Sequence, residues 1–96
     1  MSEPKKFRKK PVEIEAFWYD GTNSAAVVAW AATEDVFTVP DGPDADLRRP
    51  DGALLMIRTL EGMLHVSVRD YVIRGVQDEF YPCKPDIFAQ TYEVVV

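Results

Sequence analysis

The clearest two-residue alternation of side chains in the chain covers residues 12–19. This period, together with β-branched and aromatic residues, predicts a strand that begins after Pro11. We expect the face that carries Trp18 to pack into the core. The opposite face, which carries Phe17 and Tyr19, would then form an apolar patch that a partner protein covers.

Residues 24–33 predict a short helix. Asn23 precedes it and is a suitable N-cap, because its side chain can accept hydrogen bonds from the free amides of a first turn. Val27, Trp30 and Ala31 fall on one stripe of this helix, so we expect that stripe to face a sheet.

Short apolar runs between turn residues predict the rest of the structure. The connection that contains Gly62 favours a β-hairpin. The stretch 40–52 contains Pro-Asp-Gly twice and predicts a loop, and loops of this length are usually mobile or functional. The final strand is β-branched with one charge, so we expect it to pair near the sheet centre. The expected strands cover residues 36–39, 53–59, 63–68, 71–74, 79–83 and 91–96, with a single helical turn over 85–89.

These elements predict one α+β domain over residues 11–96, with a curved, mainly antiparallel sheet of five to seven strands and one helix packed on it. Trp18, Trp30, Phe80 and Phe88 are the expected aromatic core. The single cysteine excludes an internal disulfide and fits a reducing compartment. No apolar run approaches the roughly 20 residues of a membrane helix and no secretory signal is evident, so we expect a protein of the host-cell cytoplasm.

Charge is distributed unevenly along the chain. Residues 1–10 form a basic arm, whereas residues 12–96 carry six basic and fifteen acidic side chains within a net charge of −5. The body should repel nucleic acid, while the arm could attract it. The alternative, which we favour, is a solubilising arm that either frays in water or is held against the acidic body. The basic side chains of the arm are Lys5, Lys6, Arg8, Lys9 and Lys10.

Several strings spaced along the chain resemble the small bacteriophage proteins grouped as the PGDYG-type domain. The signature Pro-Gly before Asp-Tyr is Val68-Arg69 here, so less permissive residues must form the same bend. The resemblance implies a phage origin and an α+β fold. No activity is described for such proteins, so no catalytic residue follows from it. The matching strings are residues 9–17, 59–62, 68–76, 79–88 and 92–93.

A nucleophilic site around Cys83 is one candidate for chemistry. Lys84 beside the thiol would lower its pKa, and Glu79 and Tyr81 share its strand face. Such a site also needs a base, and nothing in the sequence brings the sole histidine, His65, close to the thiol. We therefore expect an unreactive, half-buried thiol, a solvent-facing histidine and no catalytic residue.

Metal and cofactor sites are not indicated. One histidine and one cysteine cannot supply the four ligands of a usual zinc site. The aspartates at positions 41, 44, 46 and 51 do not keep the spacing of a calcium-binding EF-hand loop. We expect neither a metal nor a cofactor.

Two polar groups beside the strands have alternative explanations. Asp70 precedes Tyr71 at the start of a strand and either presents a carboxylate to Arg69 or Arg74, or accepts backbone amides in a turn, which we favour. Arginines 58, 69 and 74 either converge on an anion or pair across strands with Glu61, Asp70 or Glu79.

The favoured function is a non-enzymatic phage accessory protein that acts by protein–protein interaction with a host component. A homodimer would follow if the first or last strand pairs with a second copy. The runner-up is nucleic-acid or nucleotide binding through the arm and the three arginines, and an enzyme that uses Cys83 is third. The candidate binding residues are Lys5, Lys6, Arg8, Lys9, Lys10, Arg58, Arg69, Asp70, Tyr71, Arg74, Glu79 and Tyr81.

Overall fold

The computed structural model describes residues 3–8, 10–42 and 48–95. Lys9, residues 43–47 of the predicted loop and Val96 of the predicted last strand lie outside the described residues. In chain order the described elements are β1 (Glu15–Trp18), α1 (Ser24–Ala31), β2 (Val36–Pro40), β3 (Ala53–Thr59), β4 (Gly62–His65), β5 (Tyr71–Arg74), β6 (Phe80–Cys83) and α2 (Pro85–Thr91).

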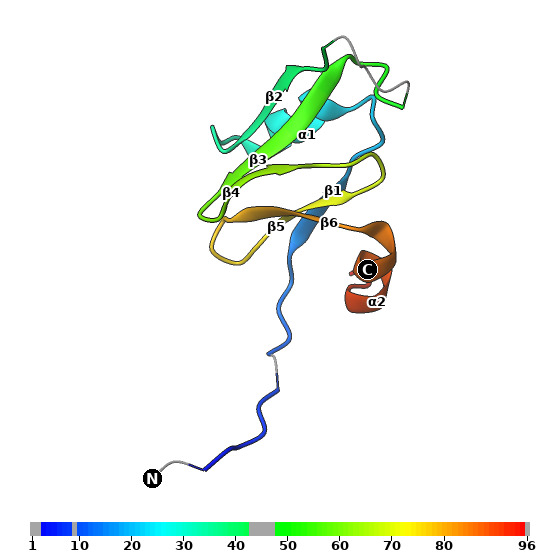
Figure 1. Cartoon of the computed structure of the whole chain (residues 1–96). Helices are drawn as coiled ribbons and strands as arrows, with labels where there is room; N and C mark the ends of the chain where they lie inside the picture. The colour runs from blue at the N-terminus through cyan, green and yellow to red at the C-terminus, as the bar shows by residue number, and fades with distance from the viewer. Residues whose placement is uncertain (1–2, 9, 43–47, 96) are drawn as a thin grey trace.

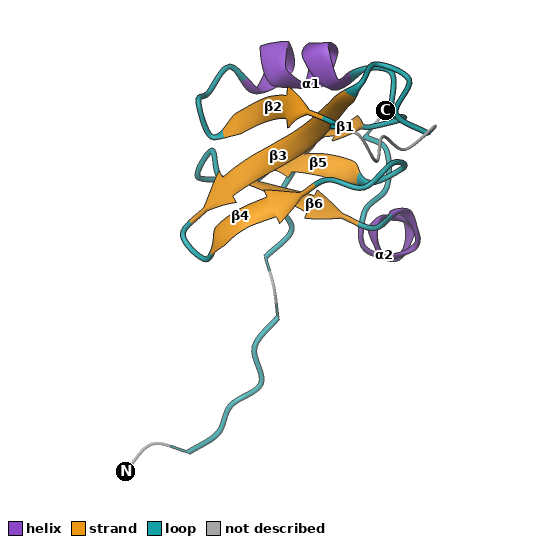
Figure 2. Cartoon of the chain, turned by 45° about the horizontal axis from the view of Figure 1, so that its top comes forward, coloured by secondary structure: helices purple, strands orange, loops and turns teal. Residues whose placement is uncertain are grey.

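The strands form two three-stranded antiparallel sheets, in the orders β1-β5-β6 and β2-β3-β4. Helix α1 connects the two sheets and packs against β2 and β3, whereas α2 follows β6 (Figures 1 and 2). The α+β class is confirmed. The prediction of one sheet with one helix is matched only roughly, because the structure has two helices and β5 pairs with β1 in a second sheet rather than with β4.

Local side-chain bonds fix the turn of the β3–β4 hairpin. Thr59 faces Gly62 across the pair, so Leu60 and Glu61 form a two-residue turn. The Thr59 hydroxyl donates to the carbonyl of Gly62 at 2.8 Å and accepts from the amide of Glu61 at 3.1 Å. Gly62 has φ of 116°, a left-handed conformation that favours glycine.

The core is apolar and lies between α1 and the strands. The face of β1 that packs against this core is opposite to the predicted one. Tyr19, beyond the end of β1, is 0 % exposed and Phe17 packs against the core, whereas Trp18 is 46 % exposed. The prediction that Trp18 points inward and Phe17 and Tyr19 outward was therefore wrong. Both faces carry large apolar side chains, so alternation alone cannot identify the inner one. The outer Trp18 instead donates from its indole N–H to the carbonyl of Arg69 at 2.9 Å.

The bend before β5 is built from residues that are unusual for it. Arg69 has φ of 80°, in the left-handed region, at the position where the PGDYG signature has glycine. Its amide donates to the carbonyl of Tyr19 at 2.7 Å, and the amide of Tyr19 donates to the carbonyl of Asp70 at 2.9 Å. These bonds extend the β1–β5 pairing into the bend.

Burial of Tyr19 raises the pKa of its hydroxyl from 10.0 to about 12, with a further contribution from the nearby carboxylate of Asp51. The folded protein therefore keeps this proton where the unfolded chain loses it, and stability present below pH 10 is lost as the pH rises towards 12. The buried hydroxyl has no hydrogen-bond partner among the residues that the structure describes. An unpaired buried hydroxyl destabilises a fold by about 1 kcal/mol or more.

We expect Tyr19→Phe to leave the free energy of unfolding at pH 7 unchanged or raised by about 1 kcal/mol, because only the unpaired hydroxyl is removed. The variant should also lose less stability than the wild type between pH 10 and pH 12, the window of the shift. Urea titrations at neutral and alkaline pH measure both effects. Equal alkaline losses in the two proteins would show that Tyr19 does not set this dependence.

The prediction of a last strand over residues 91–96 was wrong for its described part. Helix α2 runs from Pro85 to Thr91, longer than the single turn expected, and residues 92–95 form no strand. Proline suits the first helical position, and the amide of Tyr92 closes the helix on the carbonyl of Phe88 at 2.9 Å. β-branched residues favour a strand only where a sheet edge accepts them, and Val94 and Val95 are instead exposed.

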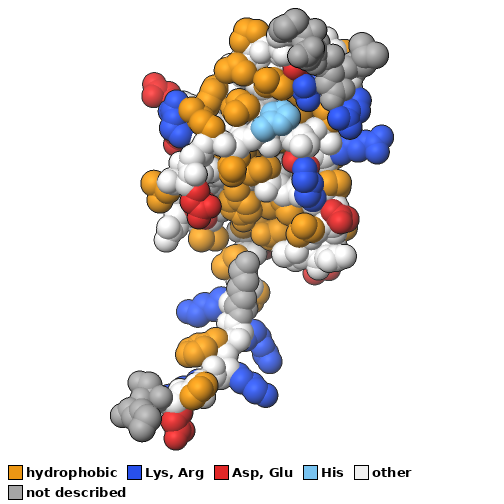
Figure 3. Space-filling model, in the orientation of Figure 1, with side chains coloured by type: hydrophobic (Ala, Val, Ile, Leu, Met, Phe, Trp, Pro, Cys, Tyr) orange, Lys and Arg blue, Asp and Glu red, His pale blue; other side chains and the backbone are white. Residues whose placement is uncertain are grey.

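The described residues of the N-terminal arm extend away from the body (Figures 1 and 3). Residues 10–14 also precede the first strand, so the extended segment reaches further than residue 10. Phe7 is 92 % exposed, which is unusual for a phenylalanine.

Candidate functional site

A pocket of about 510 Å³ lies where three connections of the fold meet. They are the segment before β2, the β3–β4 turn and the β5–β6 turn, which share one edge of the molecule (left in Figure 1). The volume falls in the range of small-ligand and side-chain pockets. Its lining residues are Asp35, Arg58, Thr59, Leu60, Glu61, Leu64, Asp78, Glu79, Phe80 and Tyr81.

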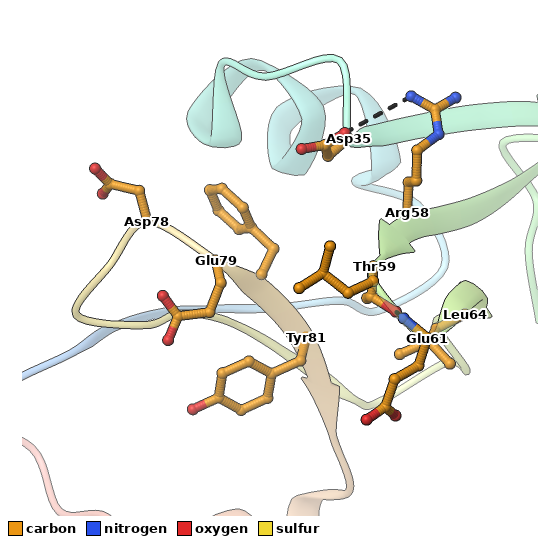
Figure 4. Close-up of a pocket in the computed structure, with 10 residues that line it drawn as sticks. Asp35, Arg58, Thr59, Glu61, Leu64, Asp78, Glu79 and Tyr81 are labelled. Carbon is orange, nitrogen blue, oxygen red and sulfur yellow. Dashed lines mark hydrogen bonds and ion pairs between the residues drawn. The ribbon is translucent and has the colours of Figure 1, made fainter.

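The pocket has an acidic rim and an apolar floor. Four carboxylates and one guanidinium are among its lining residues, so its formal charge is negative. Asp78 and Glu79 lie on one side of the opening and Glu61 on the other, with Tyr81 between them (Figure 4). Leu64, Phe80 and Tyr81 supply apolar surface from the two sheets. This arrangement suits a ligand that carries positive charge beside an apolar group.

Three of the four carboxylates, those of Glu61, Asp78 and Glu79, have no ion-pair partner among the described residues. Asp35 pairs with Arg58, with 3.6 Å between Oδ1 and Nη1, and both side chains are half-exposed. Glu79 accepts from the amide of Gln77 at 2.8 Å, which holds it in the β5–β6 turn. In the described part of the chain, no ion pair reaches Glu61 or Asp78, so both are available to a ligand.

Tyr81 lines the pocket as a neutral phenol. Burial, followed by the neighbouring Tyr92 hydroxyl, raises the pKa of Tyr81 well above that of an ordinary tyrosine. The two hydroxyl oxygens lie 3.4 Å apart. The ring of Tyr92 packs on Phe88, with the ring centroids 5.0 Å apart, so α2 supports this wall of the pocket.

The structure gives Arg58 and Arg74 separate partners, although they were predicted to converge on an anion or pair across strands with Glu61, Asp70 or Glu79. Arg58 lies over the ring of Phe37, with Cζ 5.4 Å from the centroid, and pairs with Asp35. Arg74 pairs with Glu15 at 3.0 Å on the neighbouring strand. Arg69 lies in the exposed bend before β5. Of the three, only Arg58 lines the pocket.

Asp70 has the predicted turn role, with an additional partner. It is buried and accepts from the amide of Ser67 at 3.0 Å. Its carboxylate pairs with the ammonium of Lys84 at 3.2 Å, and not with Arg69 or Arg74, the partners considered from the sequence. Tyr71 stacks on Phe88 with 3.8 Å between ring centroids. Asp70, through Lys84 at the start of α2, and Tyr71, through Phe88, thus join α2 to the β1-β5-β6 sheet.

The surroundings of Cys83 oppose the reactive-thiol hypothesis. Burial, followed by the carboxylates of Asp70 and Asp86, raises the pKa of the thiol, whereas Lys84 was expected to lower it. The ammonium of Lys84 is held by Asp70, and the thiol points at the carbonyl of Lys84, 3.6 Å away. His65 is exposed on β4, in the other sheet.

The described cations of the arm form no ion pair with the described part of the body. Lys5, Lys6, Arg8 and Lys10 are exposed, and Figure 3 shows the basic side chains along the arm, separate from the body. Lys9, the fifth cation predicted to bind a ligand, lies outside the described residues.

Comparisons of the chain with protein-family models, curated proteins and solved structures found no match. The resemblance to PGDYG-type proteins therefore stays a hypothesis. Among the described residues, no group of three or more His, Cys, Asp or Glu side chains could hold a metal ion. Neither of the two described helices has the length and apolar character needed to cross a membrane.

Proposed function

We propose that the chain is a small non-enzymatic accessory protein that acts through protein contacts, and that its acidic pocket binds a basic segment of the partner. The observation that carries this proposal is the combination of an aromatic floor with the carboxylates of Glu61 and Asp78, which pair with no described cation. The resemblance to phage proteins supports a host protein as the partner.

The recognition chemistry follows from the arrangement of the pocket. A lysine or arginine side chain gains most when it approaches carboxylates that have no other cation. An apolar residue beside it would cover the half-buried Tyr81 and the exposed side chain of Leu64. The same carboxylates repel phosphate, so the pocket opposes nucleic acid.

A defined peptide tests the proposal with the full chain. We expect a fluorescent peptide of alternating lysine and phenylalanine to bind and the same peptide with glutamate for lysine not to bind, as measured by anisotropy. Glu61→Lys combined with Asp78→Asn should raise the dissociation constant roughly tenfold or more. Asp86→Asn combined with Glu93→Lys is the matched control, because it changes the net charge equally at exposed positions outside the pocket.

Peptide binding that is absent, or that both double variants weaken equally, contradicts the proposal. Retention of a labelled single-stranded oligonucleotide in place of the peptide would instead favour the nucleic-acid alternative. The exposed basic arm is the observation that keeps this alternative.

A further inference from the structure

We propose that the basic arm of a second copy of this chain binds in the acidic pocket, so that two copies exchange arms reciprocally. This inference rests on the proposed function, because it names one occupant of the same pocket. It differs from the strand-pairing homodimer expected from the sequence, because side chains of the arm and the pocket make the contact.

The arm carries the positive charges that complement the carboxylates of the pocket. Lys5, Lys6, Arg8 and Lys10 are exposed cations, and Glu61 and Asp78 are carboxylates that no described cation pairs with. Charges brought together at a partly desolvated site interact more strongly than the same charges spread through water. The arm and the pocket are therefore electrostatically complementary.

Phe7 gives the arm an apolar anchor among these cations. Its side chain is 92 % exposed, so it gains from any apolar contact that removes it from water. In an extended chain, Lys6 and Arg8 point to the face opposite Phe7. With Phe7 directed at Tyr81, the cations on either side can turn towards the acidic rim.

The position of the arm favours a second copy over its own pocket. Glu15 of β1 lies opposite Arg74 of β5, and Arg74 lies opposite Phe80 of β6. Strand β1 therefore begins at the end of the sheet that carries the β5–β6 turn. The arm then leads away from the body (Figure 1). Pro11 restricts the residue before it to extended conformations, which opposes a reversal there.

If the chain reversed its direction nearer the N-terminus, few residues would remain to reach its own pocket. The whole extended arm, by contrast, can reach the pocket of a neighbouring copy. Residues 3–14 span at most about 40 Å when extended. Because each arm starts beside its own pocket, two copies that face each other through their pockets can exchange both arms around one twofold axis.

Sedimentation velocity over a range of concentrations tests the exchange. We expect the wild type to form dimers that dissociate as salt is raised. Lys5→Gln, Lys6→Gln, Arg8→Gln and Lys10→Gln together define the arm variant, and Glu61→Lys with Asp78→Asn defines the pocket variant. Each variant alone should be monomeric. Phe7→Ser should weaken the dimer roughly tenfold, and Asp86→Asn with Glu93→Lys should leave it intact.

A mixture of the two variants gives the sharpest result. The arm variant keeps a native pocket and the pocket variant keeps a native arm, so one exchange remains and a heterodimer should form. A wild type that stays monomeric, a dimer that survives in the arm variant, or a mixture without heterodimer would each overturn the inference. If the lysine–phenylalanine peptide still binds while the wild type is monomeric, the proposed function stands and only the arm exchange fails.

Discussion

Replacement of Gly21 by alanine is expected to lower the free energy of unfolding by about 3 kcal/mol. Gly21 has φ of 91°, and a Cβ atom there would overlap the carbonyl oxygen of Arg48. A backbone oxygen cannot rotate away as a flexible side chain can. The segment that contains Arg48 would therefore have to move.

That segment is attached to the body close by. The carboxylate of Asp51 accepts from the hydroxyl of Ser24 at 2.5 Å, and the guanidinium of Arg49 donates to both carboxylate oxygens of Asp41, at 2.9 and 3.1 Å. Movement of Arg48 would strain these contacts. Unfolding in urea, followed by circular dichroism, measures the loss.

Gly52→Ala is the matched control for Gly21→Ala. Gly52 also has a left-handed φ, 72°, but a Cβ atom added there would meet no atom within 4 Å. We expect this variant to lose about 1 kcal/mol, the conformational contribution alone. Equal losses at the two positions would show that the approach of Arg48 contributes nothing.

Replacement of Arg74 by methionine is expected to lower the free energy of unfolding by about 3 kcal/mol, and Arg74→Lys by about 2 kcal/mol. The Arg74 guanidinium donates to the carbonyls of Trp30 and Ala31 at 2.9 and 3.2 Å. These carbonyls belong to the last turn of α1, which has no basic residue of its own. A cation from β5 thus satisfies the negative end of the helix.

Aromatic rings add to this contact. The Cζ atom of Arg74 lies 4.9 Å from the ring centroid of Trp30 and 5.2 Å from that of Phe80. Lysine keeps the charge but cannot present a planar group to two rings and two carbonyls at once. Arg58→Met is the control, because an exposed ion pair such as that with Asp35 contributes less than about 1 kcal/mol. Similar losses at both arginines, measured by urea unfolding, would contradict the assigned role of Arg74.

Some strands could be predicted correctly from the sequence, because the apolar pattern and the flanking turn residues indicated the same bounds. Strands 53–59 and 71–74 have the predicted bounds, since glycine and polar residues flank compact apolar runs. The inner face of β1 did not follow, because apolar side chains occupy both faces and tertiary packing decided between Trp18 and Tyr19. The last predicted strand failed because propensity does not supply a sheet edge.

The candidate site was only partly visible in the sequence. Arg58, Glu79 and Tyr81 were predicted to bind a ligand and do line the pocket, but Glu61 was considered only as a pairing partner and Asp78 was not considered. Their carboxylates lie in separate turns, which come together only when the two sheets pack. The available signal was an acidic residue in each of three connections that the strand order brings to one edge.

The way the chain threads through the two sheets bears on the order in which they assemble. Strands β2, β3 and β4 come from one continuous segment, residues 36–65, whereas β1 must find β5 across more than fifty intervening residues. Closing a long loop slows the formation of a contact. The β2-β3-β4 sheet can therefore form early and the β1-β5-β6 sheet late. The acidic pocket is lined by residues of both sheets. It is therefore complete only after the second sheet has formed and packed, late in folding.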